Sequence, residues 1–204
     1  MSKDSTERSP VTQEFGTLRA VRLDLAADLR HRSVSALNRL LAHAMAMRDL
    51  YKKAHWQTSG ATFYALHLMF DKHYQEQLTL VDQLAERVQT LGGVALALAH
   101  DVVEESRIAR APRGREAPEN QLARLRDGHE FVLKEARALA RSAAEDGDDG
   151  TADLIVGSLV RTHELQSWFV AEHLSSFDAS LPVDGAAPAF NLLRARPSDR
   201  PKVN

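Results

Sequence analysis

The chain has 204 residues, of which 44% are hydrophobic and 26% charged, and its formal net charge is −2. The length suits one globular domain with a sizeable core, and the charge gives no global reason to expect nucleic acid or an acidic membrane as a partner. The sequence has no cysteine, which excludes disulfides, thiolate metal sites and cysteine nucleophiles.

Both ends of the chain differ in composition from the middle. Residues 1–16 are polar and lack helical periodicity, so we expect a mobile tail there. Residues 175–204 contain four prolines and a small excess of basic residues, which predicts a second tail. Residues 17–174 then form the folded domain. With no secretory h-region and no apolar run of 18 residues, we expect a cytoplasmic protein, nucleoid-associated at most, and without a membrane span.

Four segments between the tails have a helical period, and none alternates as a strand does. Their approximate ranges are up to Trp56, 62–91, 119–144 and 151–174. The second segment stops at Gly92-Gly93, a C-terminal stop signal. A long connection over 94–117, with room for a short helix, joins the second segment to the third. Four helices with one long crossover predict an all-α bundle with the topology of ferritin-like folds.

The fourth segment is apolar on several sides, which is typical of a well-buried helix. The residues that give it this character are Leu154, Ile155, Leu159, Leu165, Trp168 and Phe169.

Five candidate metal ligands lie on the second segment or just before it: His55, His67, Asp71, Asp82 and Glu86. His67/Asp71 and Asp82/Glu86 are i,i+4 pairs, so each pair shares one helix face. All four fall within an arc of roughly 100°, next to the apolar stripe of the same helix. The second helix therefore carries one stripe for the core and another for chemistry.

The two pairs cannot reach one metal ion within a single chain. Their centres are 15 residues apart, which is about 22 Å along an α-helix, whereas metal–ligand bonds are only ~2 Å long. Two copies crossing antiparallel near Glu76 and Gln77 would bring the first pair of one copy beside the second pair of the other. A twofold interface of this kind makes two sites per dimer, and His55 is placed to add a further nitrogen.

Two imidazoles and three carboxylates suit Fe(II) better than Ca²⁺ or Mg²⁺, and zinc remains possible. The ordinary interpretation of either i,i+4 pair alone is a solvated helix face. An isolated histidine is likewise more often a core or surface residue than a ligand, and this applies to His43, His73, His129 and His163. It is the five candidates together, at these spacings, that indicate a site.

Two stretches carry a family resemblance: KKAHWQTSGATFYALHLMFD over residues 52–71 and DQLAERVQTLGGVALA over 82–97. They resemble the central signature of the Dps family, the DNA-binding proteins from starved cells. The fourth segment is similar to the family's last helix around Trp168-Phe169, and the resemblance covers roughly residues 34–175.

The resemblance implies a hollow homododecamer of four-helix subunits, built from antiparallel dimers, with ferroxidase sites at the twofold interfaces. His55, His67 and Asp71 of one subunit would join Asp82 and Glu86 of its neighbour. Fe(II) would be oxidised by hydrogen peroxide in preference to oxygen, and Fe(III) mineral would be stored inside the shell.

The resemblance also assigns roles outside the ligand set. Trp56 corresponds to a family aromatic thought to protect against radicals, and the alternative is a residue that packs in an interface. Glu145, Asp149 and Asp153 correspond to carboxylates at threefold pores through which iron passes. The alternative for this acidic group is helix capping by Asp148 or Asp149 together with a solvated turn.

Two other iron or zinc enzymes fit the sequence less well. An ordinary ferritin or bacterioferritin holds its two irons inside one bundle with Glu-x-x-His motifs, and this sequence contains no such motif. A zinc hydrolase of the H-E-x-x-H type fails because His163-Glu164 lacks the second histidine.

DNA compaction through the C-terminal tail is the alternative function. The first tail is not basic, but the last eleven residues carry four cations against Asp199. These cations are Arg194, Arg196, Arg200 and Lys202. Twelve copies of a weakly basic tail can bind through multivalency.

Overall fold

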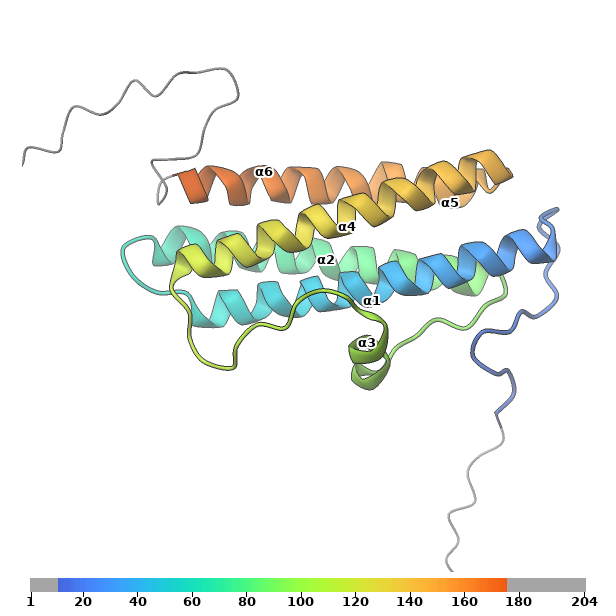
Figure 1. Ribbon diagram of the computed structural model, residues 1–204, viewed down its shortest axis with the longest axis horizontal. Helices are drawn as coiled ribbons and strands as arrows, with labels where there is room; N and C mark the ends of the chain where they lie inside the picture. Colours follow the sequence, from blue (N-terminus) through green and yellow to red (C-terminus); the bar gives the residue numbers. More distant parts are fainter. Residues whose placement is uncertain (1–10, 176–204) are drawn as a thin grey trace, which may run out of the picture.

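Four long helical rods lie side by side in the computed structural model (Figure 1), in which residues 11–175 are described. The helices of the bundle are α1 (Ala27–Gln57), α2 (Phe63–Thr90), α4 (Pro118–Asp146) and a fourth rod. The fourth rod consists of α5 (Asp149–Leu154), a π-helical segment (Ile155–Val160) and α6 (Arg161–Ser175). The described part of the chain has no strand. The prediction of an all-α, four-helix bundle is confirmed.

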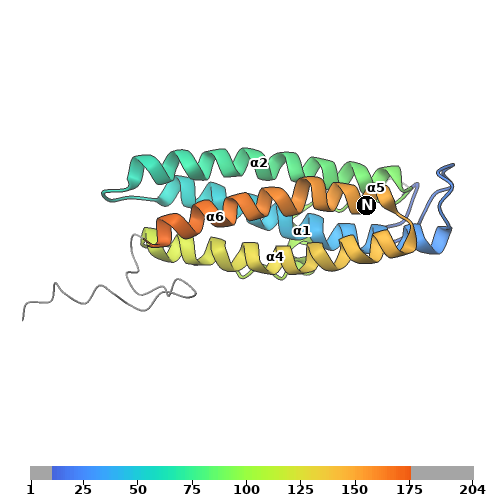
Figure 2. The ribbon, with the colours of Figure 1, turned by 90° about the horizontal axis from the view of Figure 1, so that it is seen from above.

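The connection between α2 and α4 runs the length of the bundle and contains the short helix α3 (Ala99–Glu105). In Figure 1 this connection passes along the outside of α1, and α3 contacts α1. α2 and α4 therefore run in the same direction, whereas α1 and α2 form an antiparallel hairpin (Figure 2). This is the predicted long crossover, and α1 and α2 pack against each other along their hairpin.

The end of α2 is fixed by the Gly92-Gly93 pair, as predicted. Gly92 has a φ of +86°, and a Cβ there would stand 2.7 Å from the Arg19 carbonyl oxygen. A Cβ on Gly93 would stand 2.6 Å from a methyl carbon of Val34. Only glycine allows the chain to pass this closely under α1 and the N-terminal segment.

A buried carboxylate ties the helices together at the same end of the bundle. Asp148 caps α5 by accepting a hydrogen bond from the Thr151 amide, forms an ion pair with Arg87 of α2, and accepts a hydrogen bond of 2.6 Å from the Ser33 hydroxyl of α1. Burial alone would raise the pKa of Asp148, but the hydrogen bonds from Ser33 and Thr151 and the charge of Arg87 bring that pKa below its ordinary value. The charged carboxylate of Asp148 thus links α1, α2 and the α4–α5 turn.

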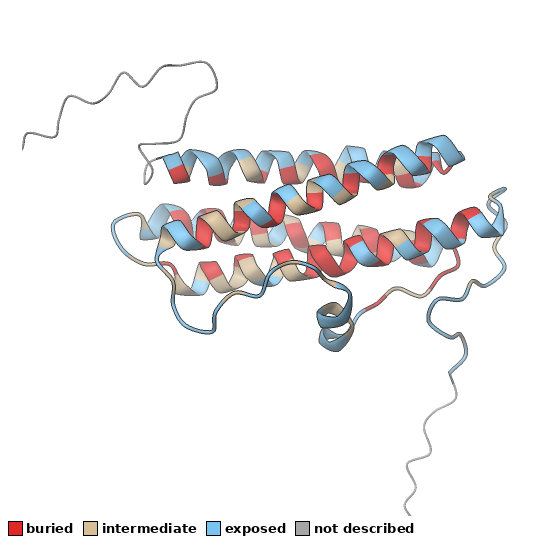
Figure 3. Cartoon of the chain, viewed as in Figure 1, coloured by how far each residue is buried: buried red, intermediate tan, exposed pale blue. Residues whose placement is uncertain are grey.

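Buried residues, drawn red in Figure 3, recur along all four rods. Most are apolar, with Tyr51, Phe70, Leu37 and Leu41 among the largest that are fully buried. The fourth rod departs from the sequence-based expectation. Four of its large apolar side chains are exposed in the single chain: Val156 (47%), Leu165 (42%), Trp168 (57%) and Phe169 (38%).

The N-terminal segment from residue 11 follows the end of α2 instead of leaving the bundle. The Gln13 amide donates hydrogen bonds to the carbonyls of Thr17 and Gly92. Residues 1–10 and 176–204 lie outside the described residues, so the predicted division into two tails and a domain stays a prediction. No helix of the described part is long and apolar enough to cross a membrane.

Candidate metal centre

The hairpin of α1 and α2 brings three of the five predicted ligands together. His55 lies in the last turn of α1, and His67 and Asp71 lie in the first turns of α2. The two imidazole rings stack with centroids 3.8 Å apart and an interplanar angle of 23°. The Phe63 ring also contacts His67, with a centroid separation of 5.0 Å.

Each histidine is held by the backbone of the other. His55 Nδ1 lies 2.9 Å from the His67 carbonyl oxygen, and His67 Nδ1 lies 3.0 Å from the His55 carbonyl oxygen. A carbonyl oxygen only accepts, so both Nδ1 atoms carry the proton and donate. The lone pair of each neutral ring is then on Nε2, the nitrogen free to bind a metal ion. The hairpin therefore fixes both the orientation and the tautomer of two ligands.

Asp71 completes this half of the centre. Its Oδ1 atom lies 3.9 Å from His55 Nε2 and accepts a 2.8 Å hydrogen bond from Lys52 Nζ. The hydrogen bond from Lys52 lowers the pKa of Asp71. The Lys52 ammonium also lies 4.4 Å from the centroid of the Tyr74 ring. A cation is thus already in contact with the oxygen that a metal ion would use.

The other two predicted ligands stand elsewhere on α2. Asp82 and Glu86 are exposed, and neither forms an ion pair within residues 11–175. No group of three His, Cys, Asp or Glu side chains among the described residues can hold a metal ion. Within one chain the two predicted ligand pairs therefore stay apart, separated by about 22 Å of helix.

Exposed apolar side chains surround the His55/His67 half-site. They are Trp56 (68% exposed in the single chain), Phe63 (43%), Tyr64 (74%) and Leu68 (50%). Exposed apolar groups gathered in one place mark a surface that binds another protein or a ligand. Trp56 directly follows His55, and its predicted protective role rests on the resemblance alone.

The acidic group at the α4–α5 turn divides into one buried and three exposed residues. Asp148 provides the cap of α5, so the capping alternative applies to Asp148. Glu145, Asp149 and Asp153 are exposed. Their carboxylates therefore remain available to a neighbouring subunit or to ions, which is what the predicted pore role requires.

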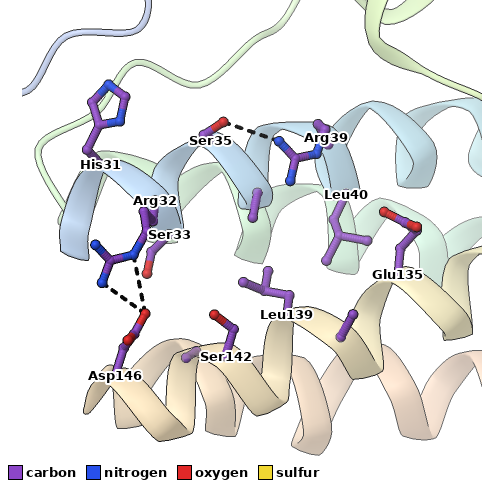
Figure 4. A pocket seen from close by; sticks show the side chains of 13 residues that line it. His31, Arg32, Ser33, Ser35, Arg39, Leu40, Glu135, Leu139, Ser142 and Asp146 are labelled. Carbon is purple, nitrogen blue, oxygen red and sulfur yellow. Dashed lines mark hydrogen bonds and ion pairs between the residues drawn. The ribbon is translucent and has the colours of Figure 1, made fainter. Parts of the chain in front are cut away.

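A groove of about 460 Å³ lies between α1 and the C-terminal half of α4 (Figure 4). Arg32 crosses it to pair with Asp146 at 3.0 Å, and Arg39 and Glu135 also line it. None of the five predicted ligands lines this groove. The predicted metal centre therefore lies outside this groove.

Lys52 is the residue of this centre that the sequence analysis missed. It precedes His55 by three residues, a spacing that places both on neighbouring positions of one helix face. A cation at that spacing from a candidate ligand is the signal that could have identified it.

Comparison with known proteins places the fold and the half-sites in context. The profile of the ferritin-like domain family matches residues 34–180. The structure is similar to DpsC from Streptomyces coelicolor, with a TM-score of 0.80 and 50% identity, over 81% of this chain and 96% of that one.

Two more distant relatives carry informative descriptions. A Dps protein from Vibrio cholerae O1, described as a member of the ferritin-like diiron-carboxylate superfamily, is 26% identical with a TM-score of 0.72, over 78% of this chain and 99% of that one. A nutrient stress-induced DNA-binding protein from Nostoc sp. is 34% identical, over 80% of this chain and 90% of its own length.

The contact between Lys52 and Asp71 generates a first prediction. Lys52→Met should tighten the binding of Zn²⁺, a redox-inert probe, because the ion no longer has to displace an ammonium group. A partly exposed ion pair is worth up to about 1 kcal/mol, so we expect a gain of roughly two- to fivefold, measured by calorimetry. Lys72→Met is the matched control, since Lys72 pairs with Glu76 and not with a predicted ligand. Equal affinities for both variants would show that Lys52 does not compete with the metal ion.

Proposed function

This chain belongs to the Dps proteins of the ferritin-like family, and on that premise we propose that it is a ferroxidase and an iron store. The observation that carries the proposal is the reciprocal bonding of His55 and His67, which leaves two metal-binding nitrogens beside the Asp71 carboxylate. The Vibrio cholerae relative, described as a diiron-carboxylate protein, supports iron as the metal.

We propose that the centre is completed by a second subunit. An antiparallel crossing of two α2 helices near Glu76 and Gln77 would place Asp82 and Glu86 of one subunit opposite His67 and Asp71 of the other. The exposed apolar residues around the half-site would be covered by this contact, which removes them from water. Six such dimers would form the hollow dodecamer expected of a Dps protein.

Iron is the substrate of the proposed reaction. Two Fe(II) ions side by side supply the two electrons that one peroxide needs: 2 Fe(II) + H₂O₂ + 2 H⁺ → 2 Fe(III) + 2 H₂O. No hydroxyl radical leaves the site because neither electron is delivered alone. His55 and His67 bind through Nε2, their Nδ1 protons being held by carbonyls. The three carboxylates favour Fe(III), which is the harder ion and prefers oxygen ligands.

The proposal predicts that substitutions in the two half-sites complement each other. His67→Ala and Glu86→Ala should each abolish fast peroxide-dependent Fe(II) oxidation, followed by absorbance, while light scattering still gives a mass near twelve subunits. Mixed shells of the two variants should regain part of the activity, because some twofold interfaces then hold one intact site. His100→Ala, an exposed histidine of α3, is the control.

If mixed shells form but stay inactive, both residues serve a site within the same subunit. A stable monomer that still oxidises iron quickly would reject the shared centre altogether.

We also propose that Asp149 and Asp153, with Glu145 in a minor role, line the route by which iron enters the shell. Both aspartates are exposed beside the buried cap Asp148, and three converging copies would focus a negative potential that attracts cations. Replacing Asp149 and Asp153 with asparagine should slow mineral growth without lowering the peroxide consumed per bound iron. Unchanged mineral growth would leave these residues as a solvated turn.

A second candidate function, DNA binding, is favoured by one feature of the described surface. Four arginines of the connection between α3 and α4 are exposed, and none forms an ion pair within residues 11–175. They are Arg107, Arg110, Arg113 and Arg115. The cations of the C-terminal tail lie outside the described residues. Unpaired guanidinium groups bind phosphates, and the Nostoc relative is named for DNA binding.

Two variants distinguish the connection between α3 and α4 from the C-terminal tail as the source of DNA affinity. One lacks arginines of the connection, and the other lacks residues 190–204. Replacing Arg110, Arg113 and Arg115 with glutamine should weaken a gel shift and flatten its salt dependence by roughly one phosphate contact per arginine. The control replaces Arg126 and Arg137, which already form ion pairs with Asp127 and Glu164. Loss of the shift only when residues 190–204 are removed would assign DNA binding to the tail instead.

A further inference from the structure

Six polar side chains are buried together between the four rods of the bundle. They are Tyr51 on α1, His73 and Gln77 on α2, His129 on α4, and His163 and Gln166 on α6. Each is at most 1% exposed. His129 and His163 contact each other directly between α4 and α6, with their Nδ1 atoms 2.9 Å apart. Buried polar groups find their hydrogen-bond partners inside the protein, so the protons of this histidine pair can be located from the contacts around it.

The Glu76 carboxylate fixes the direction of these hydrogen bonds. One of its oxygens is paired with Lys72, and the other lies 2.8 Å from the Gln166 amide nitrogen. A carboxylate only accepts, so the Gln166 nitrogen donates to it, and the Gln166 oxygen accepts from the Gln77 amide at 2.9 Å. The same Gln77 nitrogen also lies 3.2 Å from His163 Nε2. His163 Nε2 is therefore an acceptor and carries no proton.

The protons of the histidine pair follow from this direction. Because its Nε2 accepts, neutral His163 carries its proton on Nδ1 and donates it to His129 Nδ1. Neutral His129 then carries its own proton on Nε2, which contacts the Tyr51 hydroxyl. In this arrangement every nitrogen of the two rings either donates to an acceptor or accepts from a donor.

A further proton does not fit into this arrangement. On His163 Nε2 it would face an N–H group of Gln77, and on His129 Nδ1 it would face the N–H group of His163. Reversing the two amides does not relieve this, because Gln166 would then turn its oxygen toward the Glu76 carboxylate. Protonation of either ring thus sets two N–H groups against each other, and a contact that joins α6 to α4 or to α2 must break.

The groups around the pair do not favour a charged imidazole. Among the described residues, the titratable side chains that face the two rings are Tyr51 on α1 and His73 on α2. Burial raises the pKa of Tyr51 well above its ordinary value, so its hydroxyl stays neutral. The Glu76 carboxylate is connected to the pair only through the two glutamines. Burial lowers the pKa of His129 well below its ordinary value and that of His163 to about 3, so both rings are neutral at pH 7.

We propose that the contact between His129 and His163 is an acid-sensitive switch, which holds α6 against α4 while both rings are neutral and opens when either ring is protonated. Opening would loosen the fourth rod within its own subunit. The switch is separate from the proposed ferroxidase and does not depend on it, because the predicted metal ligands lie on the outer face of α2.

The direction of the pH effect follows from the protons that each state binds. In the open state each histidine has its ordinary pKa of about 6.5, whereas in the closed state the pKa of both is lowered. The open state therefore binds more protons below about pH 6.5, and the closed state loses stability as the pH falls from there toward the lowered pKa values. Over that range the opening constant rises up to about tenfold per pH unit for each histidine.

The test is hydrogen exchange of the full-length, metal-free protein, followed by mass spectrometry between pH 7 and pH 5. After correction for intrinsic exchange rates, the α4 and α6 peptides that contain the pair should open more often below pH 6, by up to about a hundredfold per pH unit. His163→Gln and His129→Gln should each reduce this dependence to about tenfold, because a glutamine donates and accepts as the ring does but does not titrate. The matched control is His43→Gln, a buried histidine of α1 outside this group, which should keep the wild-type dependence.

Circular dichroism and light scattering establish that each variant folds and assembles as the wild type does, and either glutamine variant suffices if the other fails to fold. The wild type decides without any variant: if its α4 and α6 peptides open no more often at pH 5 than at pH 6, the proposal is overturned. It is also overturned if a folded glutamine variant keeps the full wild-type dependence, or if His43→Gln flattens that dependence as much. Ferroxidase activity is measured independently, so neither result decides the other proposal.

Discussion

The distance between the two ligand pairs on α2 is the constraint on which the rest of the arrangement depends. A straight α-helix holds His67/Asp71 and Asp82/Glu86 about 22 Å apart, and no packing within one bundle can shorten it. Each chain therefore exposes the two predicted half-sites, and the charge of their carboxylates must be compensated within the single chain. Lys52 does this for Asp71 by a 2.8 Å contact, while Asp82 and Glu86 stay in water. Exposure of the ligands follows from the geometry of the helix.

The helices and their ends were predictable because their signals are local. Apolar periodicity marks each rod, and glycine is needed at position 92 because a Cβ there would stand 2.7 Å from a backbone oxygen. The π-helical segment was not predicted, because its cause is spread along the fourth rod. Ile155 and Leu174 are both buried and stand 19 residues apart, whereas five α-helical turns hold about 18. The π segment absorbs the additional residue, so that Ile155, His163 and Leu174 all face the core.

The candidate centre was predictable as a set of residues but not as a set of contacts. Spacing identified His67 and Asp71 as a pair on one helix face, and His55 was added because it lies at the end of the preceding helix. The reciprocal bonds of the two histidines to carbonyls depend on how the hairpin closes, which no local pattern encodes. The same limit applies to the turn after α4, where sequence left Asp148 and Asp149 as equal candidates for the cap. Burial against Arg87 and Ser33 decides for Asp148.

The contacts of the interior histidines depend on the folded bundle and cannot be inferred from their positions in the sequence. Taken singly, His129 and His163 are most simply core or surface residues, and the sequence offers no reason to connect positions 34 residues apart. In the bundle they meet at 2.9 Å and link Tyr51 to Gln77. The two faces of α2 therefore differ in the charge of the side chains they carry. Carboxylates stay on the outer face, where water or a second subunit can compensate them, and neutral imidazoles and amides occupy the inner face. Burying the carboxylates instead would cost several kcal/mol per uncompensated ion, so the division follows from solvation.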